Sequence, residues 1–179
     1  MEAKQVARAG LMVALLAVSA WVTVPFGPIP FTLQTLALAM MPAMLDRSTA
    51  IVAIVAYVLL GALGLPVFSS FMGGIGVLAG PTGGFLWGFV LGIIAATTLD
   101  CVLEEKITAP FVRALVADLV MLVVAYACGT VQLMMVASMG LMPALMAAVI
   151  PFIIPDAIKL TVGARLGCAV SRAQMRLAR

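Results

Sequence analysis

Long apolar stretches, separated by small groups of charged residues, dominate this chain. Residues 9–45, 48–99 and 119–155 contain no charged residue and are 37, 52 and 37 residues long. A membrane-spanning helix needs about 20 apolar residues, so each stretch has room for two spans or parts of two. The apolar residues do not alternate with polar ones, as they would in a transmembrane β-barrel. Helices are therefore expected, because they satisfy every backbone N–H and C=O group internally.

Helix-breaking residues divide these stretches into separate elements. Residues 25–30 contain three prolines and one glycine, and residues 64–66 read Gly-Leu-Pro. Turns are also expected at residues 46–47, 104–110 and 139–140. The first eight residues resemble the start of a signal peptide, but no small-residue cleavage site leads into a soluble domain, so we interpret them as part of the first helix. The pattern predicts an all-α, polytopic membrane protein, with one domain over residues 1–179 and six transmembrane helices at 6–24, 31–45, 49–65, 82–103, 111–138 and 142–168.

Composition and charge placement agree with a membrane protein. Hydrophobic residues make up 65% of the chain and charged residues 9%, and histidine is absent. These values exclude an ordinary cytosolic enzyme, a nucleic-acid-binding protein and a disordered chain. The connections at 25–30, 66–81 and 139–143 carry no charge, so the positive-inside rule places both termini and the other connections in the cytoplasm. Nine of the ten basic residues fall on that side: Lys4, Arg8, Arg47, Lys106, Arg113, Arg165, Arg172, Arg176 and Arg179.

Asp156 and Lys159 form the strongest candidate binding site. They are three residues apart in an apolar helical segment, so their side chains share one helix face. Each charge costs about 2.5–3.5 kcal/mol at the centre of a membrane helix, so a pair retained there indicates a function. A self-neutralising pair facing the bundle is the alternative, although Leu or Ala would avoid this cost. We expect the pair to offer a hydrogen-bond acceptor and a donor to a polar ligand.

A glycine-rich segment, residues 68–85, is the second candidate. It is too rich in glycine for a helix, and it lacks the Gly-Lys-[Ser/Thr] of a nucleotide-binding loop. Its length and its glycines are typical of a lid whose backbone approaches a ligand closely. Thr32 and Gln34 are either capping residues at a helix start or further walls of the same outward-open cavity. The candidate contacts in the segment are Ser69, Ser70, Phe71, Gly73, Gly74, Thr82, Gly83, Gly84 and Phe85.

The sequence offers no metal site and no catalytic group. Cys101, Cys128 and Cys168 lack the spacing of metal ligands, and we interpret them as small apolar residues. Neither histidine nor a serine paired with a base is present. We therefore expect no enzyme activity and no cofactor.

Three groups of residues resemble the motifs of one known family, in the same order. They are the Phe26–Gln34 segment, the glycine-rich signature in Leu60–Phe68, Gly73–Leu78 and Gly80–Gly84, and the Pro151–Lys159 segment. This combination is similar to BioY, the biotin-binding S component of energy-coupling factor (ECF) transporters. The resemblance implies a six-helix subunit of the bacterial cell (inner) membrane that binds biotin from the outer side. It also implies partners, namely a transmembrane coupling protein and two ATPase subunits, which alone would use ATP.

The resemblance further implies roles for single residues. Asp156 and Lys159 match the aspartate and lysine that contact biotin, and Ala3 and Ala7 match an Ala-x-x-x-Ala face for the coupling protein. Many relatives have Tyr at the position of Phe85, so this chain lacks one hydroxyl contact. Two alternatives stay open: the ligand is another small carboxylated vitamin such as lipoate, or the chain transports biotin without partners.

Overall fold

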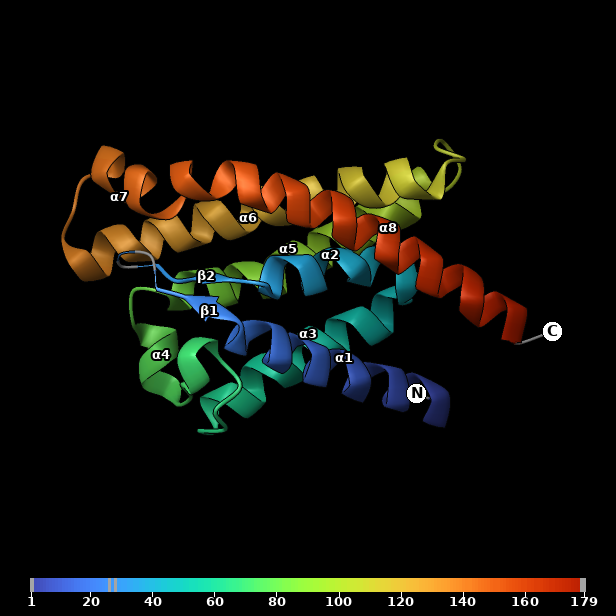
Figure 1. Ribbon diagram of the computed structural model, residues 1–179, viewed down its shortest axis with the longest axis horizontal. Coiled ribbons are helices and arrows are strands. Elements are labelled where there is room, and N and C mark those ends of the chain that lie inside the picture. Colours follow the sequence, from blue (N-terminus) through green and yellow to red (C-terminus); the bar gives the residue numbers. More distant parts are fainter. Residues whose placement is uncertain (1, 26, 28, 178–179) are drawn as a thin grey trace.

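Helices lying side by side form almost the whole molecule, and two very short strands join them near one end (Figure 1). The computed structural model describes residues 2–25, 27 and 29–177. Phe26 and Pro28 of the predicted motif and Arg179 of the basic tail lie outside the described residues. The elements in chain order are α1 (Ala3–Trp21), β1 (Thr23–Val24), β2 (Phe31–Thr32), α2 (Gln34–Met44), α3 (Arg47–Ala62), α4 (Ile75–Ala79), α5 (Gly83–Leu103), α6 (Pro110–Ala137), α7 (Leu141–Ala148) and α8 (Ile153–Leu177).

The predicted all-α class is confirmed, but several predicted helix boundaries are wrong. The helix expected at 6–24 spans Ala3–Trp21, because Thr23–Val24 forms β1, and the helix expected at 49–65 ends at Ala62. The helix expected at 31–45 begins at Gln34, because Phe31–Thr32 pairs with β1 in antiparallel register. The helix expected at 142–168 is divided into α7 and α8 by a 3₁₀ turn at Ile150–Phe152. Pro151 lies in this turn, where its missing backbone N–H interrupts the helical hydrogen-bond pattern. After the break, α8 continues to Leu177.

Among the residues that the structure describes, four segments are long and apolar enough to cross a membrane: Ala3–Trp21, Gly83–Leu103, Pro110–Ala137 and Leu141–Arg176. The protein is therefore a polytopic helical membrane protein. The other two predicted spans are shorter, since α3 has 16 residues and α2 has 11. At 1.5 Å per residue, α2 is roughly 16 Å long, about half the hydrocarbon core of a bilayer. It packs against α8, α6 and α1 instead of standing alone.

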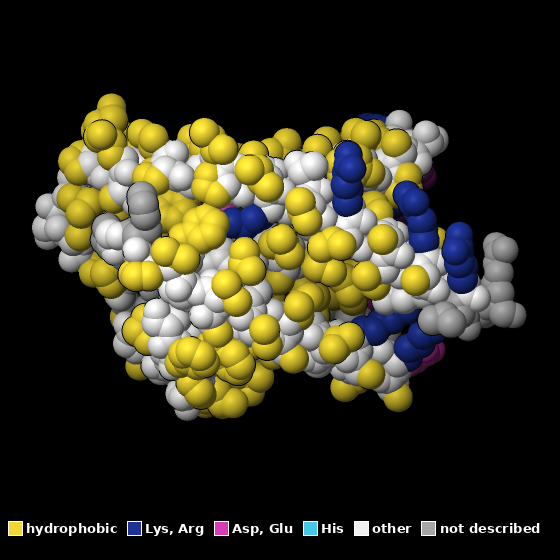
Figure 2. Space-filling model, in the orientation of Figure 1, with side chains coloured by type: hydrophobic (Ala, Val, Ile, Leu, Met, Phe, Trp, Pro, Cys, Tyr) yellow, Lys and Arg dark blue, Asp and Glu magenta, His cyan; other side chains and the backbone are white. Residues whose placement is uncertain are grey.

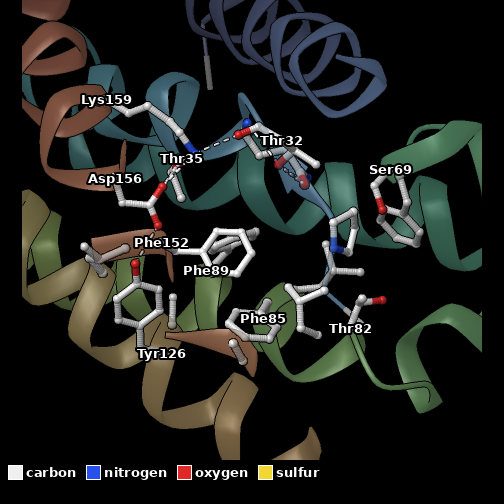
Figure 3. Close-up of a pocket in the computed structure, with 18 of the residues that line it drawn as sticks. Thr32, Thr35, Ser69, Thr82, Phe85, Phe89, Tyr126, Phe152, Asp156 and Lys159 are labelled. Atoms are coloured by element: carbon white, nitrogen blue, oxygen red, sulfur yellow. Dashed lines mark hydrogen bonds and ion pairs between the residues drawn. The ribbon is translucent and has the colours of Figure 1, made fainter. Parts of the chain in front are cut away.

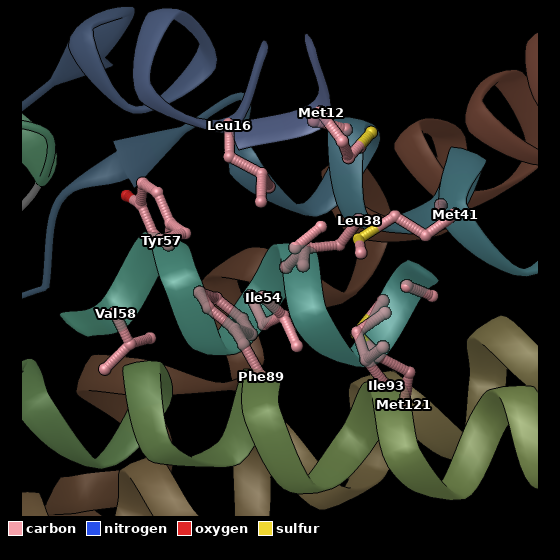
Figure 4. Close-up of a cluster of buried hydrophobic side chains, with 14 of the residues drawn as sticks. Met12, Leu16, Leu38, Met41, Ile54, Tyr57, Val58, Phe89, Ile93 and Met121 are labelled. Atoms are coloured by element: carbon pink, nitrogen blue, oxygen red, sulfur yellow. The ribbon is translucent and has the colours of Figure 1, made fainter. Parts of the chain in front are cut away.

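Glycines allow the helices to approach closely. A methyl group on Gly88 of α5 would lie 2.7 Å from Cα of Ala125 in α6. On α8, a methyl group on Gly163 would lie 2.7 Å from the backbone oxygen of Leu36 in α2. Small residues at such contacts drive helix association where lipid, not water, surrounds the bundle. Larger side chains fill the space among the helices (Figure 4): Met12, Leu16, Leu38, Met41, Ile54, Tyr57, Ile93 and Met121.

The segment between α3 and α5 contains a short helix, so the prediction that its glycines exclude a helix is wrong. Only Gly76 lies within α4, and Gly74, at φ 96°, immediately precedes it. A positive φ at this position favours glycine, because L side chains rarely adopt it. Glycine therefore starts α4 here instead of preventing it.

Hydrogen bonds and ring packing tie this segment to the bundle at both ends. At its start, Trp21 Nε1 donates to the Pro66 oxygen at 2.7 Å, and the Phe68 ring packs edge-on against Tyr57. At its end, the amide nitrogen of Gln132 donates to the backbone oxygens of Leu78 and Gly80, at 2.8 and 2.7 Å. The segment is thus packed against the bundle at both ends.

Charged side chains gather at the end of the bundle that holds both termini (Figures 1 and 2). Arg113 of α6 pairs with Asp100 of α5 there, with 2.8 Å between Nε and Oδ1. Asp46 caps α3 by accepting hydrogen bonds from the backbone nitrogen and the hydroxyl of Thr49, at 3.0 and 2.7 Å. Partial burial of Asp46 tends to raise its pKa, but the Thr49 hydrogen bonds and the nearby Arg8 hold that pKa below its ordinary value.

We expect Gly88→Ala to destabilise the protein by about 1–3 kcal/mol, because the added methyl group forces α5 away from α6. The matched control is Gly10→Ala in α1, where nothing lies within 4 Å of the new methyl group. Thermal unfolding of the detergent-solubilised proteins measures both changes. Equal midpoints for the two variants would contradict the close α5–α6 packing.

Candidate ligand-binding site

A cavity of about 70 Å³ lies inside the bundle, near the end opposite the charged one (Figure 3). Polar groups of β2, α2, α6 and α8 line one part of it, and aromatic rings line the other. Such a combination of apolar walls and a few converging polar groups is typical of a small-molecule site. The aromatic walls are Phe68, Phe85, Phe89 and Phe152, and the polar lining residues are Thr32, Gln34, Thr35, Ser69, Thr82, Tyr126, Asp156 and Lys159.

Asp156 and Lys159 form a buried ion pair at the polar part of the cavity. Their side chains project from the first turns of α8, and Lys159 Nζ lies 2.6 Å from Asp156 Oδ1. The two residues are 3% and 5% exposed. A buried charge is tolerated only where an opposite charge and hydrogen bonds compensate for lost water. The pair predicted from the sequence is therefore internally neutralised in this structure.

Every N–H of the Lys159 ammonium group has an acceptor within the protein. It donates to the backbone oxygen of Thr32 at 2.8 Å, to Thr35 Oγ1 at 3.0 Å and to Asp156 Oδ1 at 2.6 Å. An ammonium group has three donors, so none is left over. Its nitrogen also lies 3.9 Å from the centre of the Phe31 ring. In this arrangement Lys159 is the counter-ion of Asp156 and joins α8 to β2 and α2.

Two hydroxyl groups complete the surroundings of the Asp156 carboxylate. Thr35 of α2 donates to Oδ1 at 2.9 Å, and Tyr126 of α6 donates to Oδ2 at 2.6 Å. Neither residue is among those that the sequence pattern predicts for the site. Tyr126 carried a weak signal, because a tyrosine inside the charge-free stretch 119–155 is a rare polar group in an apolar helix. Its partner Asp156 lies 30 residues further on, so only the packing of α6 against α8 brings the two together.

Five other candidate residues line the cavity, namely Thr32, Gln34, Ser69, Thr82 and Phe85. Gln34 is 6% exposed and donates to the Tyr57 hydroxyl at 2.6 Å, which in turn donates to the Val67 oxygen at 2.9 Å. This chain of hydrogen bonds fixes the Gln34 amide beside the cavity. Both residues line the cavity, and Thr32 Oγ1 also accepts a hydrogen bond from the Gln34 backbone nitrogen at 3.4 Å, so Thr32 shows both of the expected features.

The remaining candidates of the glycine-rich segment lie elsewhere. Phe71 is 60% exposed and stacks on Trp21, with 5.0 Å between ring centres. Gly83 and Gly84 pack against α6, where a methyl group on Gly84 would approach the Cys128 oxygen. The structure does not place these three, or Ser70, Gly73 and Gly74, among the residues that line the cavity. The expectation that their backbone contacts the ligand stays a prediction.

Two further expectations concern partners and metals. Ala3 and Ala7 lie on the exposed side of α1, where another protein could contact them. Among the described residues, no group of three or more Cys, Asp or Glu side chains is placed to hold a metal ion.

The fold and the cavity together define a helical membrane protein that holds a ligand site between its helices. The BioY family model matches residues 1–176, so the chain belongs to the BioY family. The biotin transporter BioY of Thermotoga maritima is 37% identical over 172 residues, which cover 96% of this chain and 98% of that protein. The biotin transporter BioY2 of Lactococcus lactis is 37% identical over 161 residues, covering 89% and 86% of the two chains.

A solved structure has the same fold. It is the crystal structure of the S-component for biotin from an ECF-type ABC transporter, with a TM-score of 0.86 and 20% sequence identity. The likeness covers 94% of this chain and 91% of that one. The arrangement of helices around the cavity is therefore the S-component fold.

We expect Thr35→Val to destabilise the protein by about 1–3 kcal/mol, because it removes one donor to Asp156 and one acceptor for Lys159 from a buried network. Thr161→Val is the matched control, since Thr161 donates only to the Ala157 oxygen of its own helix. Thermal unfolding in detergent measures both variants. A Thr35 variant no less stable than the Thr161 variant would contradict the importance of this network.

Proposed function

We propose that this protein is the biotin-binding S component of a vitamin uptake system and that it transports rather than transforms its ligand. The observation that carries the proposal is the buried Asp156–Lys159 pair at one end of an otherwise apolar and aromatic cavity. Membership of the BioY family, and the names of the relatives, support biotin as the ligand.

The chemistry of biotin suits this cavity. Its ureido ring offers two N–H donors and one carbonyl acceptor, and a carboxylate such as Asp156 accepts an N–H hydrogen bond strongly. The sulfur-containing ring and the valeryl chain are apolar and suit the walls formed by Phe85, Phe89 and Phe152. Lipoate has no ureido group, so it would leave the buried Asp156 without a ligand donor. This difference favours biotin over the alternative vitamin.

The partners and the topology follow from the same proposal. We infer that six helices traverse a bacterial cell membrane, with the charged end and both termini in the cytoplasm. A transmembrane coupling protein and two ATPase subunits would supply energy, because the chain has no ATPase motif of its own. The exposed side of α1 around Ala3 and Ala7 is the proposed contact for the coupling protein.

We expect the detergent-purified protein to bind one biotin, and Asp156→Asn to weaken binding by about 10- to 100-fold. The substitution removes the negative charge and puts an amide N–H₂ where an acceptor is needed. Lys159→Ala should also weaken binding strongly, because it leaves Asp156 buried without its counter-ion. Titration with labelled biotin measures all three proteins.

Glu105→Gln is the charge control, because Glu105 is exposed in the turn between α5 and α6. Binding that survives both pocket substitutions would leave biotin as the ligand but reject this site. A folded parent protein that binds no biotin would reject the proposed ligand.

Replacing both Ala3 and Ala7 with leucine should reduce co-purification with the coupling protein by roughly tenfold or more, because large side chains prevent close helix contact. Biotin binding by the isolated variant should stay unchanged, since neither alanine lines the cavity. Ala127→Leu, on the exposed side of α6, is the control. Full assembly of the double variant would exclude this face of α1 as the contact.

A further inference from the structure

Each proton of Lys159 already has an acceptor within the protein, which favours another hydrogen-bond donor for a ligand carbonyl. Burying a carbonyl without a donor weakens binding, because the group loses its hydrogen bonds to water. Lys159 could donate to a ligand carbonyl only by giving up its hydrogen bond to Thr32, Thr35 or Asp156. The other side-chain donors that line the cavity are Thr32, Gln34, Thr35, Ser69, Thr82 and Tyr126.

Tyr126 differs from the other donors in its position. Thr35 gives its single proton to Asp156 Oδ1, and Thr32 gives its proton to the Gln34 amide oxygen at 3.3 Å. The Gln34 amide nitrogen donates to the Tyr57 hydroxyl at 2.6 Å and makes no bond to Asp156. Ser69 and Thr82 lie across the cavity from Asp156 (Figure 3). The Tyr126 hydroxyl donates to Asp156 Oδ2, the carboxylate oxygen that Lys159 and Thr35 do not use.

We propose that Tyr126 exchanges its hydrogen-bond acceptor when the ligand binds. A ring N–H of the ligand takes the place of Tyr126 at Asp156 Oδ2, and the Tyr126 O–H then donates to the neighbouring ring carbonyl. No proton leaves the atom that carries it, so the exchange conserves charge, and the single Tyr126–Asp156 hydrogen bond is replaced by two hydrogen bonds to the ligand. This inference rests on the proposed function, because it requires a ligand with adjacent N–H and C=O groups.

The geometry suits such an exchange. Tyr126 Oη and Asp156 Oδ2 lie 2.6 Å apart, so one short edge of the ligand can reach both atoms. A ureido ring has its N–H and C=O side by side along one edge, which matches an acceptor and a donor placed together. Rotation of the phenolic O–H redirects the donor towards the ligand carbonyl. Tyr126 is thereby a residue that determines specificity, because a ligand without the carbonyl leaves its O–H without an acceptor.

The test compares biotin with 2-iminobiotin, in which a protonated nitrogen that only donates replaces the carbonyl oxygen. We expect Tyr126→Phe to weaken biotin binding by about tenfold, because the variant loses one buried hydrogen bond to the ligand carbonyl. Binding of 2-iminobiotin should be unchanged or tighter, because this ligand cannot accept from Tyr126. Competition against labelled biotin in detergent measures both ligands on the parent protein and the variant.

Tyr57→Phe is the matched control, since Tyr57 is the other tyrosine and does not itself line the cavity. It should change the binding of both ligands by the same factor, because it affects Gln34 indirectly. An equal loss of both ligands in Tyr126→Phe would overturn the proposal, as it would indicate that Tyr126 only positions Asp156. Unchanged or tighter biotin binding in that variant would also overturn it, since Tyr126 would then only compete with the ligand.

Failure of the proposed function gives a different result. A folded parent protein that binds neither biotin nor 2-iminobiotin would reject biotin as the ligand, and the Tyr126 exchange with it. The exchange alone would be rejected if the parent protein binds biotin tightly and Tyr126→Phe leaves the ratio of the biotin and 2-iminobiotin affinities unchanged.

Discussion

The buried ion pair between Asp156 and Lys159 is the constraint on which the site depends. Neither charge is stable alone in an apolar interior, so the surrounding structure has to supply compensating groups. The lysine reaches the backbone of β2 and the side chain of Thr35 in α2, while the aspartate reaches Tyr126 in α6. The pair thereby fixes three separate elements around α8.

Close helix packing makes this network possible. Gly163 and Gly167 place α8 directly against the backbone of α2, which brings Thr35 within hydrogen-bond distance of the ion pair. Gly88 does the same between α5 and α6, so that Phe89 and Tyr126 face one cavity. The aromatic walls and the polar end of the site are consequences of these contacts. In a bilayer such contacts also supply much of the driving force for helix association.

Hydrogen bonds within the protein already satisfy Asp156 and Lys159 at the polar part of the site. A ligand must therefore replace existing hydrogen bonds, and its affinity depends on how well it matches the groups it displaces. A site of this kind rejects analogues that leave a buried donor or acceptor without a partner. For a vitamin transporter of the BioY family, such selectivity fits uptake of one scarce compound from a mixture of similar ones.

Several features could be predicted from the sequence, because they depend on local patterns. Long charge-free stretches predict apolar helices, clustered Lys and Arg residues predict one charged end, and two charges three residues apart on an apolar helix predict Asp156 and Lys159 as a site. The tertiary structure alone decided which residues surround that pair. Thr35 and Tyr126 are 121 and 30 residues away from Asp156, and no local pattern records such distances. It also decided that residues 66–81 pack on the bundle through Trp21 and Gln132, because these contacts join helices far apart in the sequence.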